Sequence, residues 1–304
     1  YIFNYMVVKM SVLITVYITT QNRPQLLKRA LLSLKEQSYK NFEVIVCNDA
    51  SDEVHTDDYA KVIKEFQNIF HEFNYIVNET KQGACVSRNK AIQLAQGEYI
   101  TGLDDDDYFH SKRLERFINF IDKDKFSLVC SNVKLLDDNI INKQPEKLGD
   151  GGKIITFKDI KQYNCVGNQI FVKKSILNAV GGFDPDMPAW QDYDTWFRII
   201  KDFGEAYKLN ACTMYLDDGA NRERITTSSK AYIGYKKFIE KHKDSLDEKD
   251  FISLKYMDML NRKQNIPIIN RELVQCSEIF NRVMKYQMTY RFPKLYGIYQ
   301  KIMK

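Results

Sequence analysis

Four consecutive aspartates in the middle of the chain give its clearest chemical signal. Asp104 to Asp107 directly follow the apolar run 99–103, so they are expected at the end of a buried strand. Carboxylates about 5 Å apart repel by roughly 3 kcal/mol at an effective dielectric constant near 20, so a bound cation would stabilise the ionised cluster. Oxygen ligands suit Mg²⁺ or Mn²⁺, which often take further ligands from phosphates. A solvated acidic turn or helix start is the alternative.

The elements around these aspartates alternate between strands and helices. Strands are predicted at 12–18, 42–47, 73–77, 98–103, 127–135, 169–173 and 207–216. Helices are predicted from Pro24, at 57–70, at 85–95 with Gly97 as its end, at 192–200, and from Lys230 onward. This order predicts an α/β fold with a doubly wound, mostly parallel sheet, which binds ligands at the carboxyl ends of its strands.

Composition excludes several other classes. The six cysteines are scattered and form no C-x-x-C, which argues against a zinc site or a disulfide framework and favours reduced cytosolic thiols. The four histidines lie far apart and none belongs to H-E-x-x-H, so a zinc hydrolase has no support. No apolar run reaches the ~18 residues of a membrane-spanning helix, and the first residues do not form a convincing signal peptide.

Polar residues also follow the first two predicted strands and begin two later helices. After the strands come Thr19-Thr20-Gln21-Asn22-Arg23-Pro24 and Asn48-Asp49-Ala50-Ser51. The helix segments are Gln82-Gly83-Ala84 with Ser87-Arg88-Asn89, and Gly181-Gly182-Phe183-Asp184 followed by Trp190-Gln191-Asp192-Tyr193-Asp194. Taken singly, Asp49 could be a turn or cap residue, Arg88 a surface arginine and Asp192 an ordinary acidic helix start.

In this order, the segments and the aspartate run resemble glycosyltransferase family two over roughly residues 11–225. The resemblance implies the A-type nucleotide-sugar transferase fold, a Rossmann-like sheet. We therefore expect an N-terminal extension at 1–10, a transferase domain at 11–228 and a basic helical extension at 229–304. Gln21 is a departure, because the family often has a tyrosine there that stacks on uracil.

The resemblance also implies roles for individual residues. Asp106 would hold the metal, Mn²⁺ or Mg²⁺, and Asp192 would be the catalytic base. The residues expected to bind the nucleotide sugar are Thr19, Thr20, Gln21, Asn22, Arg23, Asp49, Arg88, Asp104 and Asp105. Trp190, Gln191, Arg222 and Arg224 are expected to contact the acceptor or the diphosphate, although solvated surface arginines explain the last two equally well.

These expectations describe an inverting, metal-dependent hexosyltransferase. It would move a sugar from a UDP-sugar to a glycan or lipid-linked saccharide in capsule, O-antigen, lipopolysaccharide or related polysaccharide synthesis. A metal-dependent nucleotidyl or phosphoryl transferase also needs clustered carboxylates, but the sequence has no G-x-x-x-x-G-K-[ST]. A non-catalytic sugar-nucleotide binder is the third possibility, and the joint presence of Asp106 and Asp192 disfavours it.

The end of the chain is strongly basic. Residues 280–304 contain six basic residues and no acidic one: Arg282, Lys285, Arg291, Lys294, Lys301 and Lys304. Aromatic residues interleave with them from 291 onward, which is typical of a segment lying in a membrane interface. We expect peripheral association with an anionic membrane at the cytoplasmic inner face of the cell membrane, and no nucleic-acid partner. Packing onto the transferase domain, nucleic-acid binding and a dimer contact are the alternatives.

Overall fold

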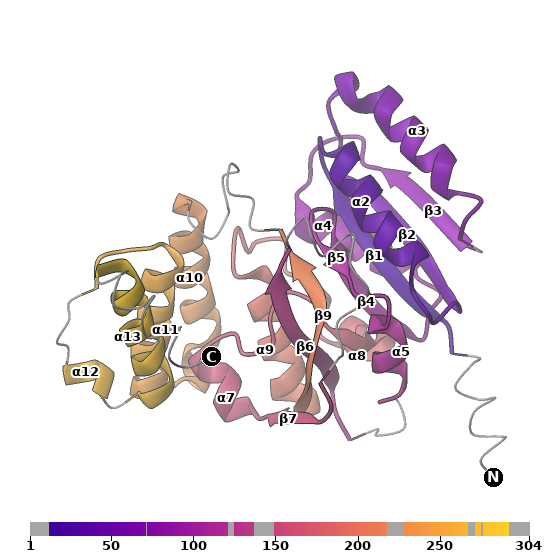
Figure 1. Ribbon diagram of the computed structural model, residues 1–304. Helices are drawn as coiled ribbons and strands as arrows, with labels where there is room; N and C mark the ends of the chain where they lie inside the picture. The colour runs from indigo at the N-terminus through magenta and orange to yellow at the C-terminus, as the bar shows by residue number, and fades with distance from the viewer. Residues whose placement is uncertain are drawn as a thin grey trace, which may run out of the picture. The chain divides into compact units, whose positions relative to one another are not determined.

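Figure 1 shows the computed structural model of the chain, which describes residues 12–70, 72–120, 125–136, 149–217, 228–266, 271–274 and 276–291. These residues form two compact units. The first lies within 1–157, 166–185 and 192–220, and the second lies within 158–165, 186–191 and 221–304. The predicted domain boundaries at residues 10 and 228 stay predictions.

A mixed sheet forms the centre of the first unit. Within the described residues it has nine strands in the order β3-β2-β1-β4-β8-β6-β9-β5, and β7 pairs with β9. The parallel half consists of β1 (Ile14–Thr20), β2 (Phe42–Asn48), β3 (Glu72–Val77) and β4 (Tyr99–Asp104). Strands β1, β2 and β4 are almost wholly buried, as parallel strands covered by helices are.

The register of the parallel half aligns the ends of its strands. Thr20 at the end of β1 pairs with Asn48 at the end of β2, and Thr19 pairs with Asp104 at the end of β4. The helices that connect these strands are α2 (Pro24–Lys35), α3 (Thr56–Phe66) and α4 (Ala84–Leu94). Three loops therefore leave the same edge of the sheet, and the predicted α/β class is confirmed.

The other half of the sheet brings in antiparallel pairs. Its strands are β5 (Tyr108–Phe109), β6 (Leu128–Leu135), β7 (Gly152–Ile155), β8 (Phe171–Lys173) and β9 (Ala206–Leu216). Strand β8 runs antiparallel to both β4 and β6, so it joins the two halves. The remaining helices of this unit are α5 (Arg113–Ile118), α8 (Lys174–Ala179) and α9 (Gln191–Phe203).

Gly97 has a different role from the predicted one. Helix α4 ends at Leu94, and Ala95 rather than Gly97 occupies its C-terminal cap. Gly97 lies against β1, where an added Cβ would stand 2.5 Å from the backbone nitrogen of Thr15. Its own N–H donates to the buried carboxylate of Glu43 (3.0 Å). A glycine is needed here because two backbones approach closely, and no left-handed cap is involved.

The second unit is helical. Its helices are most of α7 (Phe157–Gln162), α10 (Ser229–His242), α11 (Glu248–Asn261), α12 (Arg271–Val274) and α13 (Ser277–Arg291). Asp247 and Asp250 form a capping box at the start of α11, and Lys161 binds Asp250 at 2.6 Å. A small apolar core includes Tyr256, Ile279 and Val283. In the described part of the chain, none of the helices is long and apolar enough to cross a membrane.

Candidate functional site

The aspartate run lies at the aligned edge of the parallel half, where a turn follows β4, and its side chains are of two kinds. Asp104 and Asp106 are 26% and 25% exposed. Asp105 and Asp107 are buried. The first pair can therefore meet a ligand, while the second pair must be satisfied inside the protein.

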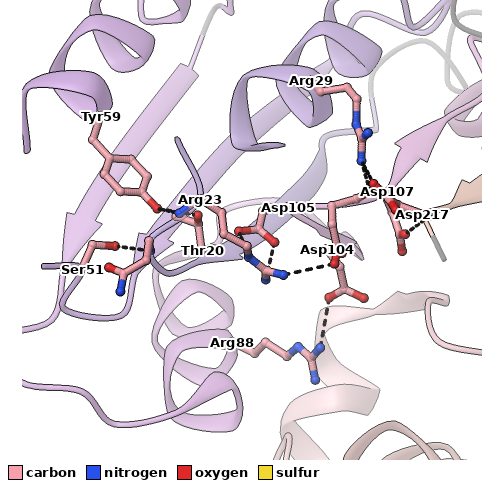
Figure 2. A network of polar contacts seen from close by, with 12 residues as sticks. Thr20, Arg23, Arg29, Ser51, Tyr59, Arg88, Asp104, Asp105, Asp107 and Asp217 are labelled. Atoms are coloured by element: carbon pink, nitrogen blue, oxygen red, sulfur yellow. Dashed lines mark hydrogen bonds and ion pairs between the residues drawn. The ribbon is translucent and has the colours of Figure 1, made fainter. Parts of the chain in front are cut away.

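Arg23 binds two of these aspartates (Figure 2). Its Nε donates to Asp105 Oδ2 and its Nη1 donates to Asp106 Oδ2, both at 3.1 Å, and its Nη2 forms an ion pair with Asp105 Oδ1 at 2.5 Å. The backbone N–H of Arg23 donates to the Tyr59 hydroxyl (3.0 Å), which also contacts the Thr20 hydroxyl (2.8 Å). Helix α3 thus helps to fix the loop that carries Arg23.

Arg88 links the aspartate run to helix α9. Its Nη2 donates to Asp104 Oδ1 and its Nη1 donates to Asp192 Oδ1, both at 3.0 Å. The side chain is only 8% exposed, and its guanidinium lies 5.0 Å from the centre of the Phe183 ring. The structure therefore brings together the candidate base and the first aspartate of the run, which are 88 residues apart in sequence.

A third arginine and a short polar chain hold the end of the run. Arg29 Nη2 donates to the carbonyl oxygen of Asp106 (2.5 Å) and to Asp217 Oδ2 (2.6 Å). Asp107 accepts the N–H of Asp217 and the side-chain amide of Asn168, both at 3.1 Å. Figure 2 shows Arg29 reaching this group from α2. Neither Arg29 nor Asn168 was predicted from the sequence, because no local pattern marks either residue.

Burial governs the protonation of the carboxyl groups. It raises the pKa of Asp105 to about 7, although the charge of Arg23 opposes the shift. It raises the pKa of Asp107 to about 9, helped by the charges of Asp104 and Asp106. Burial also raises the pKa of Asp192 to about 6, against the lowering effect of Arg88. Burial and the neighbouring arginines therefore act in opposite directions on the pKa values of Asp105 and Asp192, and the cation expected from the sequence stays a prediction.

Asp49 organises the loops beside the aspartates. Its Oδ1 accepts the side-chain amide of Asn78 and the N–H of Gln82, and its Oδ2 accepts the N–H of Gly83, all at 2.8 Å. The side-chain amide of Gln21 donates to the carbonyl oxygen of Asp49 (2.9 Å). Asp49 thus fixes the loop that leads into α4, and its expected contact with a nucleobase stays a prediction.

Backbone strain marks the first two loops. Asn22 and Ala50 both have positive φ angles, of 56° and 49°. The Asn22 N–H donates to the Ser51 hydroxyl (2.8 Å), and the Asn22 side chain exchanges two hydrogen bonds with Asp52. Such strain persists where the surroundings over-determine the backbone, as at ligand sites.

Five predicted site residues remain. Trp190 and Gln191 belong to the second unit, where the Trp190 ring packs with Tyr235 and Phe238, and Gln191 donates to the carbonyl oxygen of Met187 (3.0 Å). Arg222 and Arg224 lie outside the described residues. Thr19 is partly exposed beside Asp104 in the sheet. The expected contacts of all five with a substrate stay predictions.

Comparisons with known proteins agree with the fold and the motifs. Residues 15–181 match the family model for glycosyl transferase family 2. A protein of Escherichia coli (strain K12), named as the colanic acid biosynthesis glycosyl transferase WcaA, is 34% identical over 250 residues, 79% of this chain and 84% of its own length. The teichuronic acid biosynthesis glycosyltransferase TuaG of Bacillus subtilis is 25% identical over 66% of this chain and 77% of its own.

Solved structures share the fold at lower sequence identity. S. aureus TarS 1-349 in complex with UDP-GlcNAc is similar over 91% of this chain and 73% of that one, with a TM-score of 0.59 and 16% identity. The mannosyltransferase PcManGT from Pyrobaculum calidifontis, in complex with GDP-Man and Mn²⁺, is similar over 88% of this chain and 68% of that one, with a TM-score of 0.52 and 14% identity.

The buried carboxyl of Asp107 should make stability depend on pH. Because its pKa is higher in the folded protein than in the unfolded chain, its contribution is complete below about pH 4 and declines as the pH rises toward 9. In chelator, Asp107→Asn removes this titration, so its free energy of unfolding should decline less than that of the wild type between pH 6 and 9. Thermal unfolding at several pH values measures this difference. Asp150→Asn, at an exposed carboxylate, is the control. An unchanged slope in Asp107→Asn would contradict the assignment.

Proposed function

We propose that this chain, which belongs to glycosyltransferase family two, is an inverting transferase that moves a hexose from a UDP-sugar to a glycan or lipid-linked saccharide. The setting is the synthesis of a bacterial surface polysaccharide. Relatives named for colanic acid, teichuronic acid and amylovoran biosynthesis support this setting. The observation that carries the proposal is the Arg88 link between Asp104 and Asp192, since it places a candidate base beside the aspartates expected to bind the donor.

A uridine nucleotide is the proposed donor carrier. The loops after β1 and β2, with Gln21 and Asp49 in contact, form the predicted nucleoside site beside Asp104. A TarS structure that contains UDP-GlcNAc shares the fold, which supports this choice. GDP is the natural comparison ligand, because another protein of the same fold is described with GDP-Man.

The exposed aspartates fit a divalent cation. Among the described residues, no cluster of three or more acidic, histidine or cysteine side chains is arranged to hold a metal by itself. Asp104 and Asp106 offer two accessible sets of carboxylate oxygens, which suit an Mg²⁺ or Mn²⁺ ion that shares its coordination with a diphosphate and water. When bound, such an ion supplies positive charge that stabilises the UDP leaving group.

Asp192 is the proposed catalytic base. Its Oδ1 is held by Arg88, and among the described residues its Oδ2 has no hydrogen-bond donor. The carboxylate would accept the proton of an acceptor hydroxyl while that oxygen attacks the anomeric carbon. The bond from that carbon to UDP breaks in the same step, and UDP leaves with the electron pair. The attacking oxygen enters opposite the leaving group, so the configuration inverts.

UDP binding should depend on a divalent cation and on Asp106. Calorimetry should give at least about tenfold weaker UDP binding in chelator or in Asp106→Ala, because diphosphate and carboxylate repel without the ion. Asp49→Ala should also weaken UDP, yet its binding should remain dependent on the metal. Equal UDP affinity with and without metal would sink the metal assignment, and tighter binding of GDP than UDP would sink the donor assignment.

Removing the base should affect turnover far more than binding. Asp192→Asn should keep Mn²⁺-dependent UDP binding while turnover falls by ~10²-fold or more, as loss of a general base implies. Mn²⁺-dependent hydrolysis of UDP-glucose, UDP-galactose and UDP-N-acetylglucosamine provides the assay, with water replacing the acceptor. Asp194→Asn is a less suitable control, because Asp194 is buried and binds Arg198. Asp186→Asn, in the segment before α9, is preferable. Normal turnover in Asp192→Asn would place the base elsewhere.

We also propose peripheral attachment to the cytoplasmic face of the cell membrane. The basic tail at 292–304 lies outside the described residues. Support within the described part comes from α10, whose exposed residues include Lys230, Lys236, Lys237 and Lys241, one acidic residue, Glu240, and the apolar Ile233 and Tyr232, which are 49% and 41% exposed. Lysines around exposed apolar side chains are typical of segments that lie on anionic membranes.

Vesicle binding tests this attachment. The full chain should sediment with strongly anionic vesicles at low salt and dissociate at high salt, because each basic group contributes up to about 1 kcal/mol that ions screen. A chain ending at Arg291, and the α10 variant Lys236→Glu/Lys237→Glu, should each sediment less. Neutral vesicles are the control. If the full chain stays in solution with anionic vesicles at low salt, the membrane proposal fails.

A further inference from the structure

Arg88 is bound on both sides by carboxylates from different parts of the fold. Asp104 ends β4 and Asp192 begins α9, and each accepts a hydrogen bond at 3.0 Å from a different terminal nitrogen of the same guanidinium. The side chain is 8% exposed, so little of it can face a ligand. Both of these hydrogen bonds go to carboxylates, and the expected contact of Arg88 with the donor diphosphate stays a prediction.

The surroundings fix the position of this guanidinium. The Phe183 ring lies 5.0 Å from it, and Trp196 and Tyr17 meet that ring edge-on at 5.6 and 6.3 Å. Asn89, the next residue on α4, holds the Phe183 backbone with two hydrogen bonds of 2.7 and 2.9 Å. A glycine precedes Phe183, and an added Cβ on Gly182 would stand 2.6 Å from the Asn89 amide oxygen.

The same turn also holds the helix that carries the candidate base. Arg198 on α9 donates to the carbonyl oxygen of Gly182 (2.7 Å) and to that of Val180. It also binds the buried carboxylate of Asp194 at 2.8 Å. The turn at 181–183 therefore connects α4 and α9 on one side of Arg88, while β4 supplies Asp104 on the other.

We infer, on the premise of the proposed function, that Arg88 is the positioning residue of the base. It holds Asp192 by Oδ1 and so directs Oδ2 toward the acceptor hydroxyl. Its second terminal nitrogen ties this orientation to Asp104, at the site expected to receive the donor. Arg88 acts through Asp192 and does not itself contact the reacting atoms. Two contacts from one rigid guanidinium fix direction as well as distance, which a single lysine ammonium cannot do.

A double-mutant cycle on Mn²⁺-dependent UDP-sugar hydrolysis tests this inference. Arg88→Gln should lower kcat by at least about tenfold and change the KM for the UDP-sugar by less than about threefold. In the Asp192→Asn background the same substitution should lower kcat by less than about threefold, because the base that it positions is already lost. Arg88→Lys should recover part of the kcat that Arg88→Gln loses.

Arg29→Gln is the matched control. Arg29 belongs to the same network but contacts Asp106 and Asp217. The double variant Arg29→Gln/Asp192→Asn should therefore lose kcat by the product of the two single fold-changes. Thermal unfolding checks that each variant is folded. Should Arg88→Gln fail to fold, Phe183→Leu loosens the guanidinium while keeping both ion pairs, and the same dependence on Asp192 is expected.

The outcomes separate this inference from the proposed function. If Asp192→Asn is impaired and the effect of Arg88→Gln multiplies with it, the positioning role is overturned while the proposed base remains. If Arg88→Gln loses UDP affinity as well as kcat, the positioning role is also overturned, and a contact between Arg88 and the diphosphate is favoured. If Asp192→Asn has wild-type turnover, the base assignment fails and the inference fails with it.

Discussion

Charge compensation at one edge of the sheet is the constraint on which the rest of this site depends. Four successive carboxyl groups begin at the last residue of β4, and two of them are buried. Three guanidinium groups meet this edge. Arg23 precedes α2, Arg29 lies within α2, and Arg88 lies in the first half of α4. Breaking a buried ion pair by removing one partner typically costs about 3–5 kcal/mol. Arg88, at 8% exposed, is nearest to this case, whereas solvent screens the contacts of Arg23 and Arg29, which are 38% and 23% exposed.

The parallel register allows this compensation. Because β1, β2 and β4 end at the same level, the loops that follow them share one edge, and Arg23 after β1 reaches the aspartates after β4. Close packing around Gly102 supports this arrangement. Gly102 in β4 has no side chain, and an added Cβ would stand 2.2 Å from the Gln169 amide oxygen and 2.5 Å from the Tyr17 ring. The space beside Gly102 is therefore filled by Tyr17 of β1 and by Gln169, which precedes β8.

This arrangement has a chemical consequence for a sugar transferase. The accessible carboxylates, Asp104 and Asp106, already bind arginines, so a cation and a diphosphate would enter a site whose charge is balanced beforehand. Asp104, expected to bind the donor, and Asp192, expected to act on the acceptor, are then not independent, because Arg88 binds both carboxylates. Coupled networks of this kind respond to substitution in a non-additive way.

The sequence by itself determined the α/β order of elements, the strand that delivers the aspartates and the motif residues, because strand burial and helical periodicity are local patterns. The short strands β5 and β7 were not predicted, because two or four residues are too few to show a hydrophobic periodicity. Gly97 was misread as a helix end because close backbone approach leaves no local mark. Only the tertiary structure decided that Arg88 joins Asp104 to Asp192 and that Arg29 reaches Asp217. These pairs are 16, 104 and 188 residues apart, and their meeting follows from sheet order and helix packing, which no local pattern encodes.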